Sequence, residues 1–197
     1  MSVFIIAEAG VNHNGSLRIA RKLIDIASRS GADAIKFQTF KSENLVTKKA
    51  QRAKYQGGKG KFQLGMLKKL ELNKEMHLKL ISHCKAKKIL FLSSPFDIAS
   101  IRMLNNLGLK KIKIPSGEIT NLPYLIEVGK LNKEIILSTG MSNIKEIKDA
   151  LNVLIRAGTK KKNITILHAN SQYPTPMKDV NLKAMIKIGK IFNTSYG

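Results

Sequence analysis

Short runs of apolar and β-branched residues alternate with longer amphipathic stretches along most of the chain. Runs of four to eight such residues, bounded by turn residues, are typical of buried strands. The six runs cover residues 3–7, 34–40, 89–92, 111–114, 134–138 and 163–168. We therefore predict six strands, and residues 193–197 resemble the start of a seventh.

An amphipathic segment follows each predicted strand. In the first of these segments, Leu17, Ala20, Ile24 and Ala27 recur at helical spacing, and Gly31 stands where a helix C-cap favours a left-handed residue. Similar signals predict a helix that Asn73 caps, helices over residues 97–107 and 142–157, a short helix after residue 121 and a last helix over residues 182–192. This alternation predicts parallel strands joined by right-handed crossovers.

Two architectures contain such repeated β/α units, namely a doubly wound sheet and a (β/α)8 barrel of the TIM type. No Gly-x-Gly-x-x-Gly or Walker-type loop follows any predicted strand, so the barrel fits better. A barrel needs eight units and typically about 250 residues. We therefore expect one domain over residues 1–197 that is truncated after about six β/α units and incomplete at its C-terminus.

Residues 41–72 form one long irregular segment between the second strand and the next helix. Connections longer than about 15 residues are usually functional lids or disordered segments. Within this segment, residues 55–61 are predicted to be flexible and residues 66–72 to form a helical turn. We interpret the segment as a loop that covers the substrate, and the alternative is a mobile surface insertion.

Composition changes this picture little. The formal net charge is +22, yet only six of the 35 basic residues are arginine and tryptophan is absent, so solvated lysine faces are favoured over a nucleic-acid site. No apolar stretch approaches the roughly 20 residues of a membrane-spanning helix, and the N-terminus lacks a signal-peptide pattern. A single cysteine, Cys84, fits a reducing compartment. We expect a cytoplasmic protein with neither a nucleic-acid nor a membrane partner.

Polar residues gather where the predicted strands end, which is where barrels carry their chemistry. Lys36 and Lys113 lie inside strands, a position that lysine avoids unless it reaches an anion or water. With the hydroxyl groups of Ser94, Ser116 and Ser138, these lysines predict a cradle for a phosphate or carboxylate group. The alternative is that each lysine points outward into water.

Acids and histidines also stand at strand ends. Glu8 and Glu118 are expected across the barrel mouth from each other and could act as general base and acid, or could cap nearby amides. His168 is a candidate ligand for a divalent metal, although one histidine does not make a site. His13 is expected to shape an Asn-rich turn. The two histidines at positions 77 and 83 are expected on the surface.

Together these strand ends resemble the sialic acid synthase family. The motifs are Glu-Ala-Gly-Val-Asn-His-Asn-Gly at residues 8–15, Lys-Phe-Gln-Thr at 36–39, Ser-Pro-Phe at 94–96, Ser-Gly-Glu at 116–118, Ser-Thr-Gly-Met at 138–141 and Tyr-Pro-Thr-Pro at 173–176. Any one motif is weak, but six in order are specific. The bacterial synthases of N-acetylneuraminate and legionaminate are the nearest in pattern.

The resemblance implies a (β/α)8 barrel that condenses phosphoenolpyruvate with an N-acetylated hexosamine, such as N-acetylmannosamine or a 2,4-diacetamido relative, aided by Mn²⁺ or Mg²⁺. His168 would be one metal ligand, Glu118 would handle the water that adds at C2, and Glu8 and Gln38 would orient the substrate. Phosphoenolpyruvate would be held by Lys36, Ser94, Lys113, Ser116, Ser138 and Tyr173.

The chain departs from the family pattern in three respects. Ala169-Asn170 replaces the usual Cys-Thr, and Asn170 is expected to keep a polar contact with substrate. The second metal-binding histidine of relatives lies past residue 197, and so does the antifreeze-like domain of these homodimeric enzymes. We therefore expect this chain to be inactive alone. Two alternatives stay open, a phosphoenolpyruvate synthase with a phosphorylated acceptor and a non-catalytic basic fragment that binds polyanions.

Overall fold

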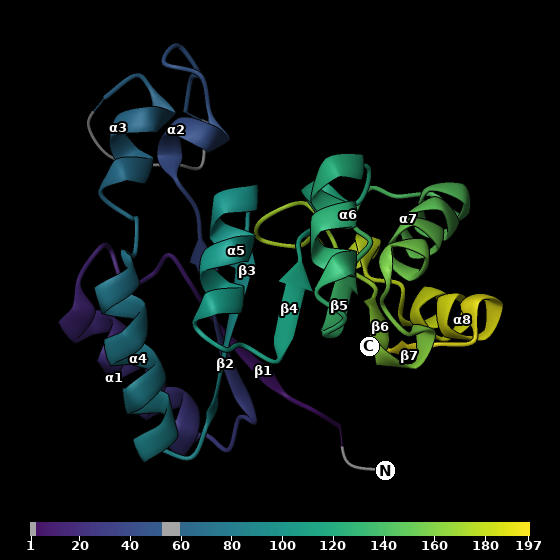
Figure 1. Ribbon diagram of the computed structural model, residues 1–197, viewed down its shortest axis with the longest axis horizontal. Coiled ribbons are helices and arrows are strands. Elements are labelled where there is room, and N and C mark those ends of the chain that lie inside the picture. The colour runs from purple at the N-terminus through teal and green to yellow at the C-terminus, as the bar shows by residue number, and fades with distance from the viewer. Residues whose placement is uncertain (1–2, 53–59) are drawn as a thin grey trace. The chain divides into compact units, whose positions relative to one another are not determined.

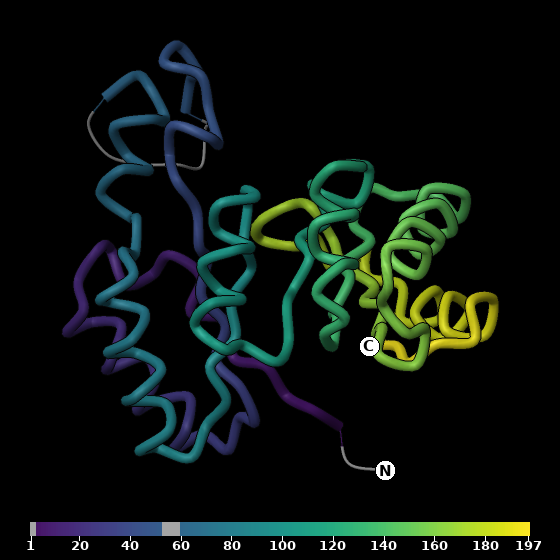
Figure 2. The backbone as a smooth tube through the Cα atoms, in the orientation of Figure 1, coloured from purple at the N-terminus to yellow at the C-terminus, as the bar shows by residue number. Residues whose placement is uncertain are grey.

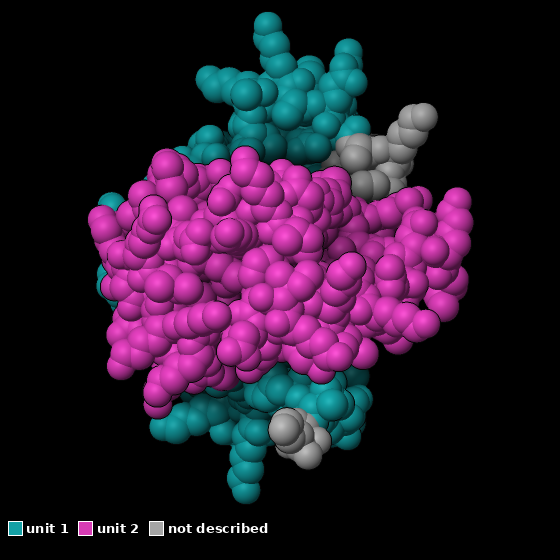
Figure 3. Space-filling view, turned by 90° about the vertical axis from the view of Figure 1, so that its right-hand side faces the viewer, with its two compact units in different colours: residues 1–107 teal, residues 108–197 magenta. Residues whose placement is uncertain are grey.

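The structure is a computed structural model that describes residues 3–52 and 60–197. The chain divides into two compact units, Met1–Leu107 and Gly108–Gly197 (Figure 3). Both units consist of parallel strands joined by helices, as the sequence predicts.

The first unit is built on a three-stranded parallel sheet with the order β1-β2-β3. Helices α1 and α4 pack against each other beside it, and α5 follows β3 (Figure 1). The elements are β1 (Ile6–Gly10), α1 (Leu17–Arg29), β2 (Ala34–Thr39), α4 (Lys74–Ala86), β3 (Leu90–Pro95) and α5 (Ile98–Asn106). Register places Glu8 beside Lys36, and Gln38 beside Ser94.

The described residues between 41 and 72, namely 41–52 and 60–72, form an insertion beyond the carboxyl end of β2 that stands apart from the sheet in Figure 2. It contains two short helices, α2 (Ser42–Leu45) and α3 (Gln63–Lys68), and Gln51 forms an antiparallel bridge with Phe62. Glu71 ties the two ends of the insertion together, because its carboxylate accepts a hydrogen bond of 2.8 Å from the Ser42 amide. Of the segment predicted to be flexible, residues 55–59 lie outside the described residues.

The second unit contains a four-stranded parallel sheet with the order β4-β5-β6-β7. Its elements are β4 (Lys111–Ile114), η1 (Ser116–Glu118), α6 (Leu122–Lys130), β5 (Glu134–Ser138), α7 (Ile144–Ala157), η2 (Lys161–Asn163), β6 (Ile164–Leu167), η3 (Met177–Asp179), α8 (Leu182–Phe192) and β7 (Ser195–Tyr196). Helices α6 and α7 pack closely because Gly129 has no side chain. A Cβ there would lie 2.6 Å from the Ala157 Cβ.

Side-chain caps start most of the longer helices. In each case an oxygen accepts a hydrogen bond from the backbone amide three residues on, a contact that stabilises a helix by about 1 kcal/mol. The capping residues are Ser16, Asn73, Asp97, Asn121, Asn143 and Asn181. The expected start at Ser142 is wrong by one residue, because Asn143 forms a reciprocal capping box with Glu146.

One further expectation is corrected. The first strand is Ile6–Gly10 rather than residues 3–7, and Val3, Phe4 and Ile5 are exposed. The seventh strand, by contrast, is present at Ser195–Tyr196. Across the described ranges, no helix combines the length and apolarity that crossing a membrane requires.

Candidate functional site

The first unit carries a polar face at the carboxyl end of its sheet. Side chains alternate between the two faces of a strand, so Lys36 and Gln38 share one face of β2. Lys36 forms an ion pair with Glu8 of the neighbouring strand. The Lys36 side chain is only 12% exposed, whereas that of Glu8 is 52% exposed. Lys36 is thus a largely buried cation, and its carboxylate partner, Glu8, is open to solvent.

Ser94 lies beside Gln38 on the same face and is 2% exposed. Its Oγ is buried without a hydrogen-bond partner in the described part of the chain. A buried hydroxyl group left unpaired costs about 1–3 kcal/mol. Ser94 therefore offers a hydroxyl group that a ligand's oxygen could satisfy, next to the buried cation.

The opposite face of β2 and β3 holds a buried hydrogen-bond network. His77 of α4 is fully buried, which makes its expected surface position wrong. Its Nε2 lies 2.8 Å from the Thr39 Oγ1, which is 2.7 Å from the Ser93 Oγ, and its Nδ1 lies 2.9 Å from the Asn73 carbonyl oxygen. Since that carbonyl only accepts, Nδ1 carries the proton and Nε2 accepts from Thr39. Burial lowers the pKa of His77.

His13 shapes the turn after β1, as expected. Its Nδ1 accepts a hydrogen bond of 3.0 Å from the Gly15 amide, and the residue is fully buried. Burial lowers the pKa of His13, and the nearby His77 lowers it further. The expected surface position of His83 is only partly right, because its half-buried ring lies 2.9 Å from Asp25.

The second unit gathers polar groups at the carboxyl ends of β4, β5 and β6. Lys113 is 8% exposed and Ser138 is 5% exposed, and strand register puts them on one face. Gly140 links the three strand ends: its amide donates a hydrogen bond of 2.9 Å to the Ser116 Oγ, and a Cβ on it would lie 2.9 Å from both the Ser116 Oγ and the Ser171 Oγ. Sequence reasoning missed Gly140 and Ser171, although both stand in the polar strings that follow their strands.

The remaining candidates of the second unit lie on loops. Glu118 falls in η1 and accepts a hydrogen bond of 2.7 Å from the Asn121 Nδ2. Asn170 is half-buried, and Tyr173 is 74% exposed. Glu8 and Glu118 belong to different units, so their expected positions across a common mouth stay a prediction.

His168 follows β6 directly. Its Nε2 accepts a long hydrogen bond of 3.4 Å from the Asn181 amide. Among residues 3–52 and 60–197, no group of three or more His, Cys, Asp or Glu side chains gathers in a way that could hold a metal ion. One imidazole that already has a backbone donor does not fit a metal centre by itself, so these residues do not form one.

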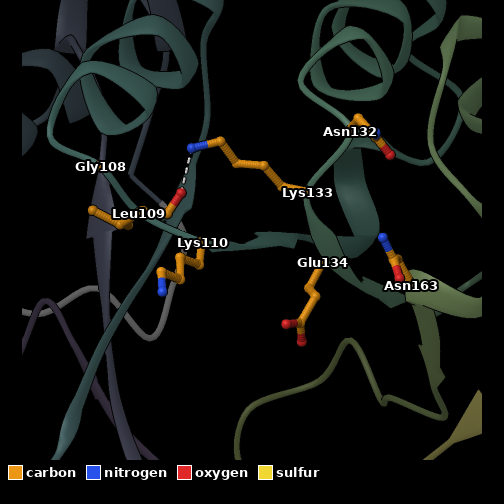
Figure 4. A pocket seen from close by; sticks show the side chains of 7 residues that line it. All are labelled: Gly108, Leu109, Lys110, Asn132, Lys133, Glu134 and Asn163. Atoms are coloured by element: carbon orange, nitrogen blue, oxygen red, sulfur yellow. Dashed lines mark hydrogen bonds between the residues drawn. The ribbon is translucent and has the colours of Figure 1, made fainter.

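Two cavities lie within single units. The first, of about 360 Å³, lies at the amino ends of β4–β6, where Lys133 donates a hydrogen bond to the Leu109 carbonyl oxygen (Figure 4). Burial lowers the pKa of Lys133. None of the predicted site residues lines this cavity, and it lies at the opposite end of the strands from them. The second, of about 400 Å³, lies between the turn after β1 and the insertion.

With this geometry established, comparison with known proteins is informative. The profile of the NeuB family matches residues 23–197. The chain belongs to the NeuB family. This membership and the parallel β/α units confirm the predicted (β/α)8-barrel type.

Relatives of this NeuB family chain carry names of sugar-acid synthases. It is 56% identical to the N,N'-diacetyllegionaminic acid synthase of Campylobacter jejuni over 98% of this chain and 59% of the relative. It is 44% identical to the enzyme of the same name from Legionella pneumophila, over 100% of this chain and 57% of the relative. The chain thus spans less than two thirds of the length of these curated relatives.

A solved structure of a sugar-acid synthetase is also similar to this chain. The chain matches the N-acetylneuraminic acid (sialic acid) synthetase of Leptospira borgpetersenii, crystallised in complex with citrate, with a TM-score of 0.85 and 32% identity. The match covers 97% of this chain and 62% of that one. The relatives named here, in sequence and in structure, are thus all synthases or synthetases of sugar acids.

Proposed function

We propose that this chain forms part of a synthase that joins phosphoenolpyruvate to an N-acylated hexosamine and releases phosphate. The product would be a nine-carbon sugar acid of the sialic or legionaminic acid type. One observation carries the proposal: in each unit a largely buried lysine, Lys36 or Lys113, lies inside a strand on the same face as a serine further along the sheet. This arrangement suits a small, multiply charged anion.

The donor would be held by these cations and hydroxyl groups. Lys36 has Glu8 as its ion-pair partner, and the unpaired Ser94 Oγ is nearby on the same face. An anionic donor that approached Lys36 would compete with Glu8 and supply Ser94 with an acceptor. The proposed donor-binding residues are Lys36, Ser94, Lys113, Ser116, Ser138 and Tyr173.

The proposed reaction forms one carbon–carbon bond and one carbon–oxygen bond, and it breaks the carbon–oxygen bond that joins C2 to the phosphate group. C3 of phosphoenolpyruvate attacks the aldehyde carbon of the open-chain sugar, whose oxygen gains a proton, and C2 becomes cationic. Water adds at C2 and loses a proton, and the resulting adduct expels phosphate to leave a 2-oxo acid. Glu118 would accept the proton of this water, because a half-buried carboxylate with one amide donor keeps free lone pairs. Glu8, Gln38 and Asn170 would orient the substrates.

The expected Mn²⁺ or Mg²⁺ and the role of His168 as its ligand stay predictions. A divalent cation would polarise the sugar aldehyde. No step assigned to the residues above depends on it, because His168 alone does not fit a metal centre. Inactivity of the 197-residue chain and dimerisation of the full-length protein likewise stay predictions.

Calorimetric titration of this chain with phosphoenolpyruvate tests the donor site. Lys36→Met should weaken binding roughly 10- to 100-fold, since hydrogen bonds to charged groups are worth about 1.5–3 kcal/mol. The control, Lys22→Met, removes an exposed lysine of α1. Equal affinity of the two variants would contradict the donor site.

Turnover is tested separately, as phosphate release from phosphoenolpyruvate and N-acetylmannosamine with Mn²⁺ present, by a protein that contains this chain. Glu118→Gln should reduce release without weakening donor binding. Release that requires a phosphorylated sugar would support the alternative acceptor. Duplex DNA binding with a steep salt dependence, and no phosphoenolpyruvate binding, would support the polyanion-binding alternative.

A further inference from the structure

We propose that Lys133 is an acylation site, and that the first cavity, which it lines, binds the acylating molecule, a small acyl phosphate. The cavity lies within the second unit at the amino ends of β4–β6, the opposite end of these strands from Ser116 and Ser138. Its volume of about 360 Å³ is within the usual range of small-molecule sites. It is therefore separate from the strand-end residues proposed to bind phosphoenolpyruvate.

The Lys133 amine is held at the cavity by a single neutral partner. Lys133 directly precedes β5 and is half-buried, and its Nζ donates a hydrogen bond to the Leu109 carbonyl oxygen, just before β4 (Figure 4). Burial lowers the pKa of this amine, which raises the fraction that is uncharged and nucleophilic. An uncharged amine can donate one N–H to Leu109 and still has its lone pair for attack.

The same contact accommodates the acylated product. An acylated lysine is a secondary amide with one remaining N–H, which can continue to donate to the Leu109 carbonyl oxygen. Acylation also removes the positive charge that burial disfavours. A lysine held by a carboxylate would instead lose its ion pair when acylated. The Leu109 carbonyl oxygen thus fits both the reacting amine and its product.

Other residues around the cavity match an acyl phosphate. Lys110, Asn132 and Asn163 line it together with Lys133. An ammonium group binds phosphoryl oxygens as a point charge, and asparagine amides donate to phosphoryl or carbonyl oxygens. An acyl phosphate can therefore contact Lys110 through its phosphoryl group while its acyl carbon faces Lys133. A neutral acyl compound would leave the Lys110 ammonium group unused.

Lys111 provides a comparison within the same unit. Burial lowers the pKa of Lys111 as well, but Lys111 forms an ion pair with Glu134, and in the described part of the chain it does not line the cavity. Glu134 itself lines the cavity, yet Lys111 balances its charge, and its side chain points away from Lys133 in Figure 4. The two lysines therefore separate the effect of the cavity from that of burial alone.

The proposed reaction transfers one acyl group. The lone pair of the Lys133 Nζ attacks the acyl carbon and forms a carbon–nitrogen bond, and the bond between that carbon and the phosphate oxygen breaks. Phosphate leaves with the electron pair and takes up the proton that the attacking amine loses. The products are an N-acylated lysine and inorganic phosphate, and no further reactant is needed.

The test is incubation of the full chain with acetyl phosphate at mildly alkaline pH, followed by quantitative mass spectrometry of each lysine. At low acetyl phosphate concentration, Lys133 should be acetylated at least about tenfold faster than Lys148, an exposed lysine of α7, because a bound reagent lies beside the amine. The rate at Lys133 should saturate with acetyl phosphate and fall when inorganic phosphate is added. At Lys148 the rate should rise linearly, and Lys111 should react no faster than Lys148.

Lys110→Met tests the contact with the phosphoryl group. Lys110 is exposed, so the variant should fold, and at low acetyl phosphate concentration it should acetylate Lys133 about two- to fivefold more slowly. Lys148→Met is the matched control and should leave the rate at Lys133 unchanged. A linear dependence at Lys133, an equal rate at Lys111, or an unchanged rate in Lys110→Met would each overturn the acylation site. Phosphoenolpyruvate binding is measured separately and does not depend on these outcomes.

Discussion

Replacing His77 with glutamine tests the network behind the site face of β2. Glutamine can still accept from the Thr39 hydroxyl group but loses the bond that the His77 Nδ1 makes to the Asn73 carbonyl oxygen. One such neutral hydrogen bond contributes about 1 kcal/mol. The free energy of unfolding at about pH 8 should therefore fall by about 1 kcal/mol.

The larger effect is on pH dependence. Burial lowers the pKa of His77 below its ordinary value of 6.5, so the folded chain binds fewer protons than the unfolded chain. The stability contributed by neutral His77 is complete above pH 6.5 and is lost as the pH falls toward the folded pKa. One proton changes the free energy of unfolding by at most about 1.4 kcal/mol per pH unit, so wild type should lose stability progressively as the pH falls below 6.5.

Glutamine does not titrate, so the variant avoids this loss. It should be less stable than wild type at about pH 8, and this difference should shrink as the pH falls below 6.5. Urea unfolding followed by circular dichroism at several pH values measures both. Glu75→Gln is the control, because the Lys79 ammonium lowers the pKa of this exposed carboxyl and keeps it charged throughout. Parallel curves for wild type and the His77 variant would refute the reasoning.

Three further predictions concern single residues. Lys113→Met should weaken phosphoenolpyruvate binding at least about tenfold, and an unchanged dissociation constant in calorimetry would exclude Lys113 from the donor site. Gly129→Ala should destabilise the chain by about 1–3 kcal/mol in urea unfolding, because its Cβ would overlap that of Ala157; an unchanged midpoint would show that α6 and α7 can separate freely. Burial raises the pKa of the Cys84 thiol to about 12, so an aromatic disulfide reagent at about pH 8 should react only after unfolding, and rapid labelling of the folded chain would contradict this.

Elements whose signals are local were predictable from the sequence. The strands Lys111–Ile114 and Glu134–Ser138 match their predicted ranges, because each is a short apolar run between turn residues. The first strand was misplaced because Val3, Phe4 and Ile5 are apolar but exposed, and the strand continues instead through the polar Glu8. A run of apolar residues does not by itself show whether those residues form a strand or the segment of chain that precedes the strand.

The sequence indicated which residue types belong to the candidate site, but it did not indicate which of these residues contact one another. A strand-interior lysine followed by polar residues indicated chemistry at Lys36, but only the parallel register reveals that Glu8 is its partner. His77 was misjudged because its surroundings come from β2 and β3, far away in sequence, and α4 has a weak amphipathic pattern. The second cavity depends on contacts between the insertion and the turn after β1, for which no sequence code exists.

Glu71 gives the insertion a property useful for protein engineering. Its carboxylate binds the Ser42 amide and lies 3.6 Å from the Lys41 Nζ, so one acid fastens both ends of the segment at a single point. A segment that runs from Lys41 to Glu71 therefore contains both partners of the contacts that hold its two ends together. Chimeras that exchange this segment between relatives would change residues that line the second cavity while the strands and their lysines stay as they are.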